Sequence, residues 1–143
     1  MQLSYDRHMG HATREGLTSA DLFAGIGGFR IGFENAGFET IYTNDNNPYC
    51  KQTYELNFDA PMDNRNIEDV LSSDIPDIDV LLAGFPCQPF SVIGKKKGFS
   101  DQRGHAFFEL HRIIKDKQPR AIVLENVRHI RTHDGGRTME VIR

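Results

Sequence analysis

A cysteine between two prolines, placed just after a short apolar run, constrains this chain more than any other feature. The run is Val80-Leu81-Leu82-Ala83, and Pro86-Cys87-Gln88-Pro89 follows it after two residues. A continuous apolar run of this length is typical of a buried strand, and prolines end such a strand and stiffen the turn. We therefore expect an α/β fold with Cys87 at the mouth of the sheet, where that class does its chemistry. The alternative role for a free cysteine is buried packing.

A glycine-rich turn follows an earlier predicted strand. The segment Leu17-Thr18-Ser19-Ala20-Asp21-Leu22-Phe23 leads into Ala24-Gly25-Ile26-Gly27-Gly28, and a helical pattern then runs to Gly37. Small residues at the start of a helix let a nucleotide approach the backbone. Arg30 stands where the dinucleotide fingerprint has its third glycine, which argues against NAD. A tight turn without a ligand is the alternative.

Acidic residues follow two further predicted strands. Asp45 directly follows the strand at 38–44 and lies about 20 residues after the glycine turn. An acid at this position typically binds a ribose or opens the next helix. Asn47-Pro48 predicts that this helix begins there. The strand at 120–124, which we expect to be buried and parallel, ends at Glu125 and Asn126, so Glu125 is a candidate proton donor or acceptor.

The remaining segments are less specific. We expect a connection at 58–76 with a weak edge strand or helical turn, a strand at 77–83, a helix at 106–117 and mostly helical structure at 127–143. In the helix at 106–117 the apolar side comprises Phe107, Leu110, Ile113 and Ile114. The loop at 91–104 carries glycines and a lysine cluster, which is typical either of a lid that meets an anion or of a solvated loop.

Composition places the chain in a broad class. Its 143 residues fit one domain or part of a larger one, and we divide it into a flexible leader at 1–16 and a folded segment at 17–143. Two cysteines and the lack of a long apolar segment indicate an intracellular, cytoplasmic protein without a membrane partner. The net charge of −3 excludes a bulk polycation, so nucleic acid would bind at local patches. His8 and His11 lack further ligands at suitable spacing, and we predict no metal site.

Three motifs together resemble one family. The segments from Asp21 to Phe29, Pro86-Cys87-Gln88 and Glu125-Asn126-Val127 look like the first, fourth and sixth motifs of the cytosine-C5 DNA methyltransferases, in the family's order and spacing. The resemblance covers about Thr18 to Arg143. It implies a Rossmann-like S-adenosylmethionine-dependent methyltransferase fold, a mostly parallel sheet with helices on both faces, incomplete at the C-terminus because the family's target-recognition region is absent.

The resemblance implies catalytic roles for three residues. Cys87 would add to carbon 6 of a flipped cytosine, so that carbon 5 can accept a methyl group. Glu125 would hold the exocyclic amine and ring N3, and Asn126 would support the site. The family pattern also implies contacts to DNA from Gln88, Ser91, Lys95 and Arg103.

The same resemblance implies the binding residues for the cofactor S-adenosyl-L-methionine. They are Asp21, Phe23, Ala24, Gly25, Gly27, Gly28, Phe29, Asp45, Asn46, Asn66, Ile67 and Pro86. Phe23 would meet the adenine and Asp45 the ribose hydroxyls. The chain departs from the family at Asn66, usually an aspartate, and at Asn46, often a large apolar residue, which predicts weaker cofactor binding.

The implied partners are double-stranded DNA, a complementing C-terminal methyltransferase polypeptide and a cognate restriction endonuclease, in a bacterial or phage context. Three alternatives stay open: a transfer-RNA cytosine methyltransferase, a non-catalytic cofactor-binding remnant or interaction module, and, from the fold alone, a nicotinamide dehydrogenase.

Overall fold

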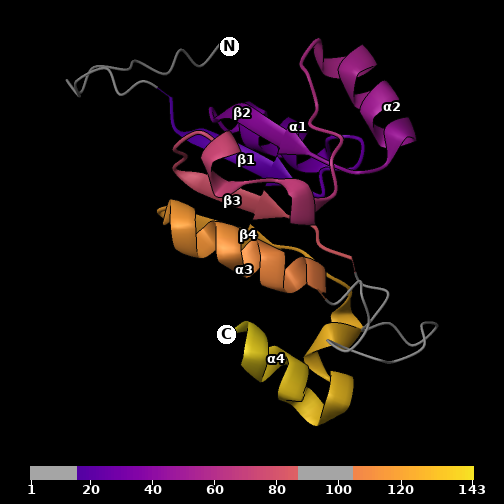
Figure 1. The fold of residues 1–143 in the computed structure, drawn as a ribbon, viewed down its shortest axis with the longest axis vertical. Coiled ribbons are helices and arrows are strands. Elements are labelled where there is room, and N and C mark those ends of the chain that lie inside the picture. The colour runs from indigo at the N-terminus through magenta and orange to yellow at the C-terminus, as the bar shows by residue number, and fades with distance from the viewer. Residues whose placement is uncertain (1–15, 87–104) are drawn as a thin grey trace, which may run out of the picture.

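The computed structural model describes residues 16–86 and 105–143. Its centre is a parallel sheet of β1 (Thr18–Leu22), β2 (Glu39–Asn44), β3 (Val80–Ala83) and β4 (Ala121–Leu124), in the order β2-β1-β3-β4 (Figure 1). The chain steps from β1 to β2 on one side and later to β3 on the other. A crevice at the carboxyl ends of the strands is the usual ligand site of such a sheet.

Helices cover both faces of this sheet. Ala20 and Leu22 of β1 face the core formed with α3 (His105–Lys117), whose Phe107, Leu110 and Ile113 are buried. On the other face, Thr43 of β2 bonds to Tyr54 of α2 (Pro48–Phe58). The helix α1 (Gly28–Asn35) packs beside β2. The predicted parallel sheet with helices on both faces and the apolar side of the helix at 106–117 are confirmed.

The connection before β3 contains helical turns. These are η1 (Ile67–Asp69) and η2 (Ser72–Asp74), and their neighbours Val70 and Ile75 are buried in the core. Of the two structures that the sequence allowed here, the helical turn is correct. The predicted strand at 77–83 is shorter than expected, because β3 begins at Val80 and the Asp79 carboxylate instead accepts the backbone N–H of Thr18 at 3.0 Å.

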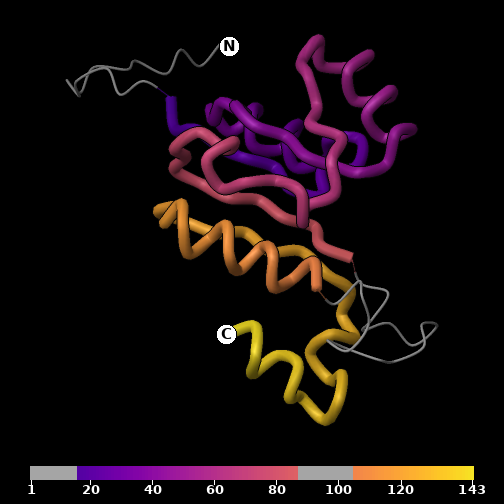
Figure 2. Tube along the Cα trace, in the orientation of Figure 1, coloured from indigo at the N-terminus to yellow at the C-terminus, as the bar shows by residue number. Residues whose placement is uncertain are grey.

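The prediction that the strand at 120–124 is buried is wrong. The strand is parallel to β3, but it is the outermost of the sheet, as the trace in Figure 2 also shows. Ala121 is exposed and Ile122 keeps 42% of its surface exposed. An apolar run indicates that a strand tends to be covered on both sides, but it does not say which segment covers it.

The C-terminal part is helical, as predicted. It consists of η5 (Arg128–Arg131), η6 (His133–Gly136) and α4 (Arg137–Ile142). Among the described residues, no helix has the length and apolar character needed to cross a bilayer.

Candidate active site

The turn between β1 and α1 has a backbone that only a few residue types tolerate. Positive φ angles occur at Phe23 (57°), Gly25 (56°) and Gly27 (94°). Gly27 caps α1, and its N–H donates to Ala24 O at 2.9 Å. A Cβ at Gly27 would lie 2.3 Å from Cε2 of Phe58, so a side chain there meets both backbone strain and a steric clash. The backbone of the turn therefore favours glycine at Gly25 and Gly27, and at Gly27 the lack of space excludes a side chain as well.

Asp45 ties this turn to the end of β2. Its Oδ2 accepts the backbone N–H of Gly25 at 2.9 Å, and its Oδ1 accepts the N–H of Asn47 at 2.8 Å. Asn47 in turn caps α2 through Tyr49, with Pro48 in the first turn, as the sequence predicted. The carboxylate thus fixes two strand ends relative to each other.

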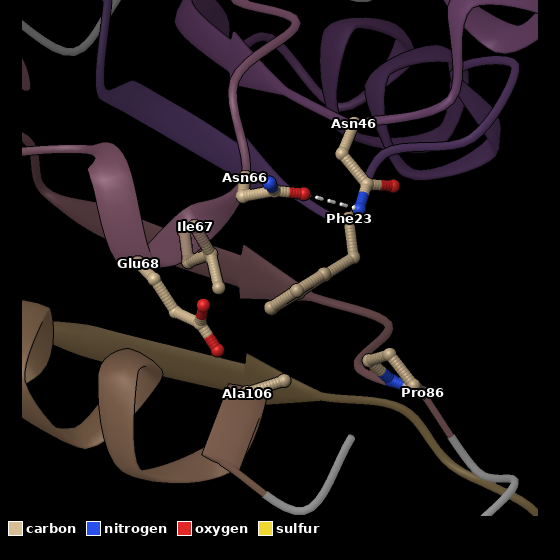
Figure 3. A pocket seen from close by; sticks show the side chains of 7 residues that line it. All are labelled: Phe23, Asn46, Asn66, Ile67, Glu68, Pro86 and Ala106. Atoms are coloured by element: carbon tan, nitrogen blue, oxygen red, sulfur yellow. Dashed lines mark hydrogen bonds between the residues drawn. The ribbon is translucent and has the colours of Figure 1, made fainter. Parts of the chain in front are cut away.

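Five of the predicted cofactor residues line one pocket of about 250 Å³ (Figure 3). Phe23, Ile67 and Pro86 supply apolar surface, and Asn46 and Asn66 supply amides at one edge. Two residues that the sequence did not suggest, Glu68 and Ala106, complete the lining. No sequence motif indicates Glu68 or Ala106 as lining residues, because they belong to η1 and to the first turn of α3 and reach the pocket only in the folded chain. A flat heteroaromatic ring matches this combination of apolar walls and a polar edge.

The two departures from the family pattern contact each other. Asn46 Nδ2 donates to Asn66 Oδ1 at 2.9 Å. Asn66 precedes η1 without capping it through its side chain, so that side chain is directed to Asn46 instead (Figure 3). The pair therefore joins the end of β2 to the connection after α2.

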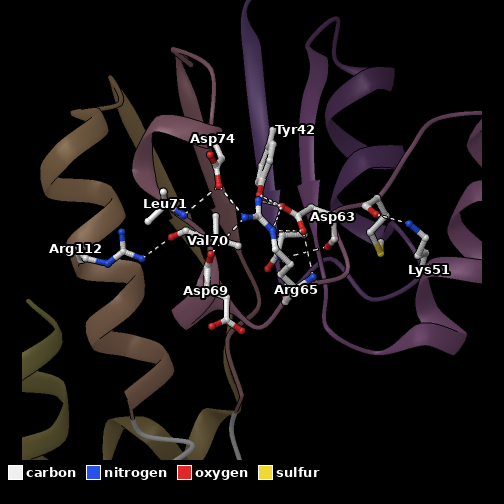
Figure 4. Close-up of polar contacts among 11 residues, drawn as sticks. Tyr42, Lys51, Asp63, Arg65, Asp69, Val70, Leu71, Asp74 and Arg112 are labelled. Carbon is white, nitrogen blue, oxygen red and sulfur yellow. Dashed lines mark hydrogen bonds and ion pairs between the residues drawn. The ribbon is translucent and has the colours of Figure 1, made fainter.

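A charged network holds the backbone next to Asn66 in place (Figure 4). The guanidinium of Arg65 contacts Asp63 at 2.6 Å and Asp74 at 2.8 Å, and Tyr42 donates its hydroxyl to Asp63 at 2.7 Å. The hydrogen bonds from Arg65 lower the pKa of Asp63 to about 2. The ion pairs of Arg65 thus hold in place the connection that carries Asn66 and Ile67.

Asp21 is the least satisfied polar group in the described residues. Its side chain is 0% exposed, and neither carboxyl oxygen has a hydrogen-bond partner in the part of the chain described. Burial raises the pKa of Asp21 to about 7 against the opposing effect of the backbone and charge of Arg30, and the nearby Asp45 raises it further. Because it is fully buried, Asp21 offers no surface to a ligand in this conformation.

Arg30, which the sequence considered only as a missing glycine, links α1 to α2. Its Nη1 donates to the Tyr54 hydroxyl at 2.8 Å, and its guanidinium lies 4.9 Å from the centre of the Phe58 ring. Tyr54 also shares a hydrogen bond of 2.7 Å with Thr43. The sequence around Arg30 does not indicate this contact, because its partners Tyr54 and Phe58 lie on a different helix.

Glu125 and Asn126 lie beside the turn that follows β3. Glu125 N–H donates to Ala83 O at 2.9 Å, and its Oε2 lies 3.5 Å from where a Cβ of Gly84 would be. Asn126 Nδ2 donates to Phe85 O at 2.9 Å. Glu125, Asn126 and Phe85 contribute to a second cavity of about 170 Å³. Glu125 and Asn126 therefore lie beside Gly84 and Phe85, the described residues that follow β3.

Five predicted residues lie outside the described residues. They are the catalytic candidate Cys87 and the DNA-contact candidates Gln88, Ser91, Lys95 and Arg103. Of the predicted cofactor residues, Gly28 and Phe29 stand in the first turn of α1, where the Phe29 ring lies 6.3 Å from that of Phe33.

The parallel sheet, the strained glycine turn and the carboxylate at the end of β2 together define an α/β protein with a pocket at its strand ends, where this class of fold usually binds its ligands. The sequence model of the C-5 cytosine-specific DNA methylases matches residues 17–143. The chain belongs to this family.

Curated relatives support the assignment. The chain is 46% identical over 128 residues to the Type II methyltransferase M.HhaI of Haemophilus parahaemolyticus, a match that covers 90% of this chain and 39% of the relative. It is 51% identical over 123 residues to M.HaeII of Haemophilus aegyptius, covering 85% of this chain and 38% of the relative. The chain thus spans about two fifths of the length of these relatives.

Solved structures show the same fold. The methyltransferase EhMeth of Entamoeba histolytica superposes with a TM-score of 0.74 at 22% identity, over 90% of this chain and 43% of that one. The Dnmt2 methyltransferase of S. pombe gives a TM-score of 0.68 at 23% identity, over 88% and 41%. At these identities the likeness concerns the fold, which is the Rossmann-like methyltransferase fold.

Proposed function

We propose that this chain supplies the cofactor-binding and base-handling part of an enzyme that methylates carbon 5 of cytosine in DNA, with S-adenosyl-L-methionine as the methyl donor. The observation that carries this proposal is the convergence of two sites at one sheet edge. Pro86 lines the pocket together with Phe23 and Asn66. Glu125 lies against Gly84, which precedes Pro86 by two residues in the chain.

The described residues suit the adenosine part of that cofactor. Phe23, Ile67 and Pro86 offer apolar surface to the purine, and the amides of Asn46 and Asn66 offer hydrogen bonds to its edge. Asp45, already positioned by Gly25 and Asn47, keeps lone pairs for ribose hydroxyls. When bound, the cofactor would supply an electrophilic methyl group on a sulfonium.

The catalytic roles follow from the chemistry of cytosine. Carbon 5 is a poor nucleophile until the Cys87 thiolate forms a bond to carbon 6, which places negative charge on the ring. Glu125 would hold the exocyclic amine and N3 and so stabilise that charge, with Asn126 fixing the backbone of Phe85 beside it. After carbon 5 has gained its methyl group, loss of the carbon 5 proton breaks the bond to sulfur and releases Cys87.

The partners are part of the same proposal. Because none of these groups can reach a base inside a duplex, the DNA would present a flipped cytosine. The exposed β4 favours further polypeptide beside it, which a C-terminal part would supply. A cognate restriction endonuclease would act on the same site, as in the Type II systems after which the relatives are named.

Trapping with 5-fluorocytosine tests the proposal. The chain is mixed with S-adenosylmethionine and pooled duplexes containing the analogue, alone and with a polypeptide covering the C-terminal part of a close relative. Fluorine cannot leave as a proton does, so an active enzyme stays bound to its substrate. We expect a denaturation-resistant protein–DNA band that is absent from Cys87→Ser.

The outcomes separate the alternatives. A Cys87-dependent band without the added polypeptide would mean that this chain is catalytic alone. A band only with the polypeptide supports a complemented enzyme. No band in either mixture, with cofactor binding intact, would identify a non-catalytic cofactor-binding module, and trapping on fluorinated transfer RNA alone would identify an RNA methyltransferase.

A further inference from the structure

Two arginines after β4, unlike most arginines in the described residues, form no ion pair with a carboxylate there. Eight arginines fall in that part of the chain, and five pair with a carboxylate, namely Arg30, Arg65, Arg112, Arg120 and Arg137. The other three, Arg128, Arg131 and Arg143, have no carboxylate within ion-pair distance among the described residues. Arg128 and Arg131 are exposed, and both lie on η5, which leaves the carboxyl end of the sheet after Glu125 (Figure 1).

The geometry of η5 brings these two charges to the same side. Residues three apart eclipse each other in a 3-10 turn, so Arg128 and Arg131 are neighbours on one face. Two guanidinium groups that face the same space repel each other unless an anion lies between them. Within the described chain no carboxylate fills that role, so a negatively charged ligand would be favoured in the space between them.

A cavity is present at this position. It has a volume of about 670 Å³, and Arg128, His129, Arg131 and Thr132 line it. The side chains offer charged and neutral hydrogen-bond donors, which is the set that contacts a phosphodiester. Arginine in particular binds phosphate oxygens through two parallel hydrogen bonds.

Arg131 connects this cavity to the site that handles the base. It also lines the smaller cavity that contains Glu125 and Asn126. A phosphate held by Arg128 and Arg131 would therefore belong to a nucleotide close to Glu125. The whole chain has a net charge of −3, so a positively charged site here is a local feature and not a property of the whole chain.

We propose that Arg128 and Arg131, with His129 between them, form a phosphate-binding site that holds the backbone of duplex DNA next to the nucleotide under attack. This inference rests on the proposed function, because it assigns the DNA contact of the same site. It adds residues from η5 to those from which the family pattern implied the DNA contacts, namely Gln88, Ser91, Lys95 and Arg103.

The test is DNA binding as a function of salt concentration. The wild-type chain, Arg128→Gln, Arg131→Gln and the double variant are titrated with a random-sequence duplex from about 50 to about 200 mM salt. Arg120→Gln is the matched control, since it removes the same charge at the opposite end of β4, where Arg120 contacts Asp79. Binding of S-adenosylhomocysteine by the same samples checks that the cofactor site is intact.

We expect the double variant to lose about tenfold in affinity, equally for all duplex sequences. The slope of log K against log salt should become shallower by about two, roughly 0.9 for each phosphate contact. Each single variant should show about half of this change in slope, and Arg120→Gln little change. Inorganic phosphate and a mononucleotide should compete only weakly, because a single phosphate lacks the neighbouring contacts of a duplex.

Three results would overturn this inference. The first is a double variant that binds DNA like Arg120→Gln, and the second is a wild-type chain without measurable DNA binding. The third is tighter binding of an RNA hairpin of equal charge, which would move the site to another nucleic acid. In each case, retained cofactor binding together with Cys87-dependent trapping in the mixture that contains the added C-terminal polypeptide would leave the proposed function standing, whereas loss of both would count against that function instead.

Discussion

The carboxylate of Asp45 accepts the backbone N–H of Gly25 at 2.9 Å, which ties the glycine turn after β1 to the end of β2. The two residues are 20 positions apart in the chain. One side chain thus shapes the turn and, under the proposed function, also binds a ribose. Stability of the turn and affinity for a nucleotide should therefore change together when this residue is altered.

Replacing Asp45 by alanine should weaken binding of S-adenosylhomocysteine by about ten- to a hundredfold, since hydrogen bonds to a charged group contribute about 1.5–3 kcal/mol. Asp45→Asn should lose less, because an amide oxygen can still accept the N–H of Gly25. Calorimetric titration measures both. Asp69→Asn, an exposed acid on η1, is the matched control, and equal affinities for it and Asp45→Ala would contradict the assigned role.

Gly27→Ala should destabilise the fold by roughly 1–3 kcal/mol, because the new Cβ would meet Phe58 and the φ angle of 94° is strained. Gly32→Ala is the control within the same helix. No atom lies within 4 Å of its added Cβ, and alanine favours a helix over glycine by about 0.5–1 kcal/mol. Urea unfolding should therefore show opposite signs for the two variants, and a loss at both sites would show that the helix, not the turn, is sensitive.

Arg30→Met should lower the free energy of unfolding by about 1–3 kcal/mol. It leaves the buried Tyr54 hydroxyl without its arginine donor and removes the cation from the Phe58 ring. Glu34→Gln tests the exposed ion pair alone, with Arg30 retained, and should change stability by less than about 0.5 kcal/mol. Thermal and urea unfolding measure both. Equal effects of the two changes would mean that the exposed ion pair, not the contact with α2, is what Arg30 contributes.

The pH dependence of stability should reveal Asp21. Burial raises its pKa from 3.8 to about 7, so between these values the folded state binds the proton and the unfolded state does not. Stability should then fall as pH rises through this window, by a few kcal/mol at most. Asp21→Asn cannot ionise and should flatten this slope in urea unfolding.

Asp63→Asn is the control for that experiment because its sign is opposite. The pKa of Asp63 is lowered to about 2, so its contribution is present above the unfolded value and is lost as the solution is acidified towards 2. This variant should leave the slope between pH 4 and pH 7 unchanged. A wild-type curve that rises across the same window would be incompatible with a protonated, buried Asp21.

Local patterns were enough for the order of strands and helices. The Asn47-Pro48 cap, the apolar side of α3 and the glycine turn were all placed correctly, because caps, periodicity and backbone sterics act over a few residues. The strand at 120–124 was placed correctly but its burial was not. Whether a strand is central or outermost depends on which segments pair with it, and its own composition does not decide that.

For the candidate site as well, some features follow from the sequence and others only from the tertiary structure. The sequence by itself determined the family, because the family motifs are short and their spacing is specific, and the residues that would carry the chemistry stay a prediction from those motifs. Only the tertiary structure decided that Asn46 bonds to Asn66, that Arg30 links two helices, and that Arg131 lies between two cavities. These relationships join residues or elements that come together only when the sheet is assembled, and local sequence does not encode such packing.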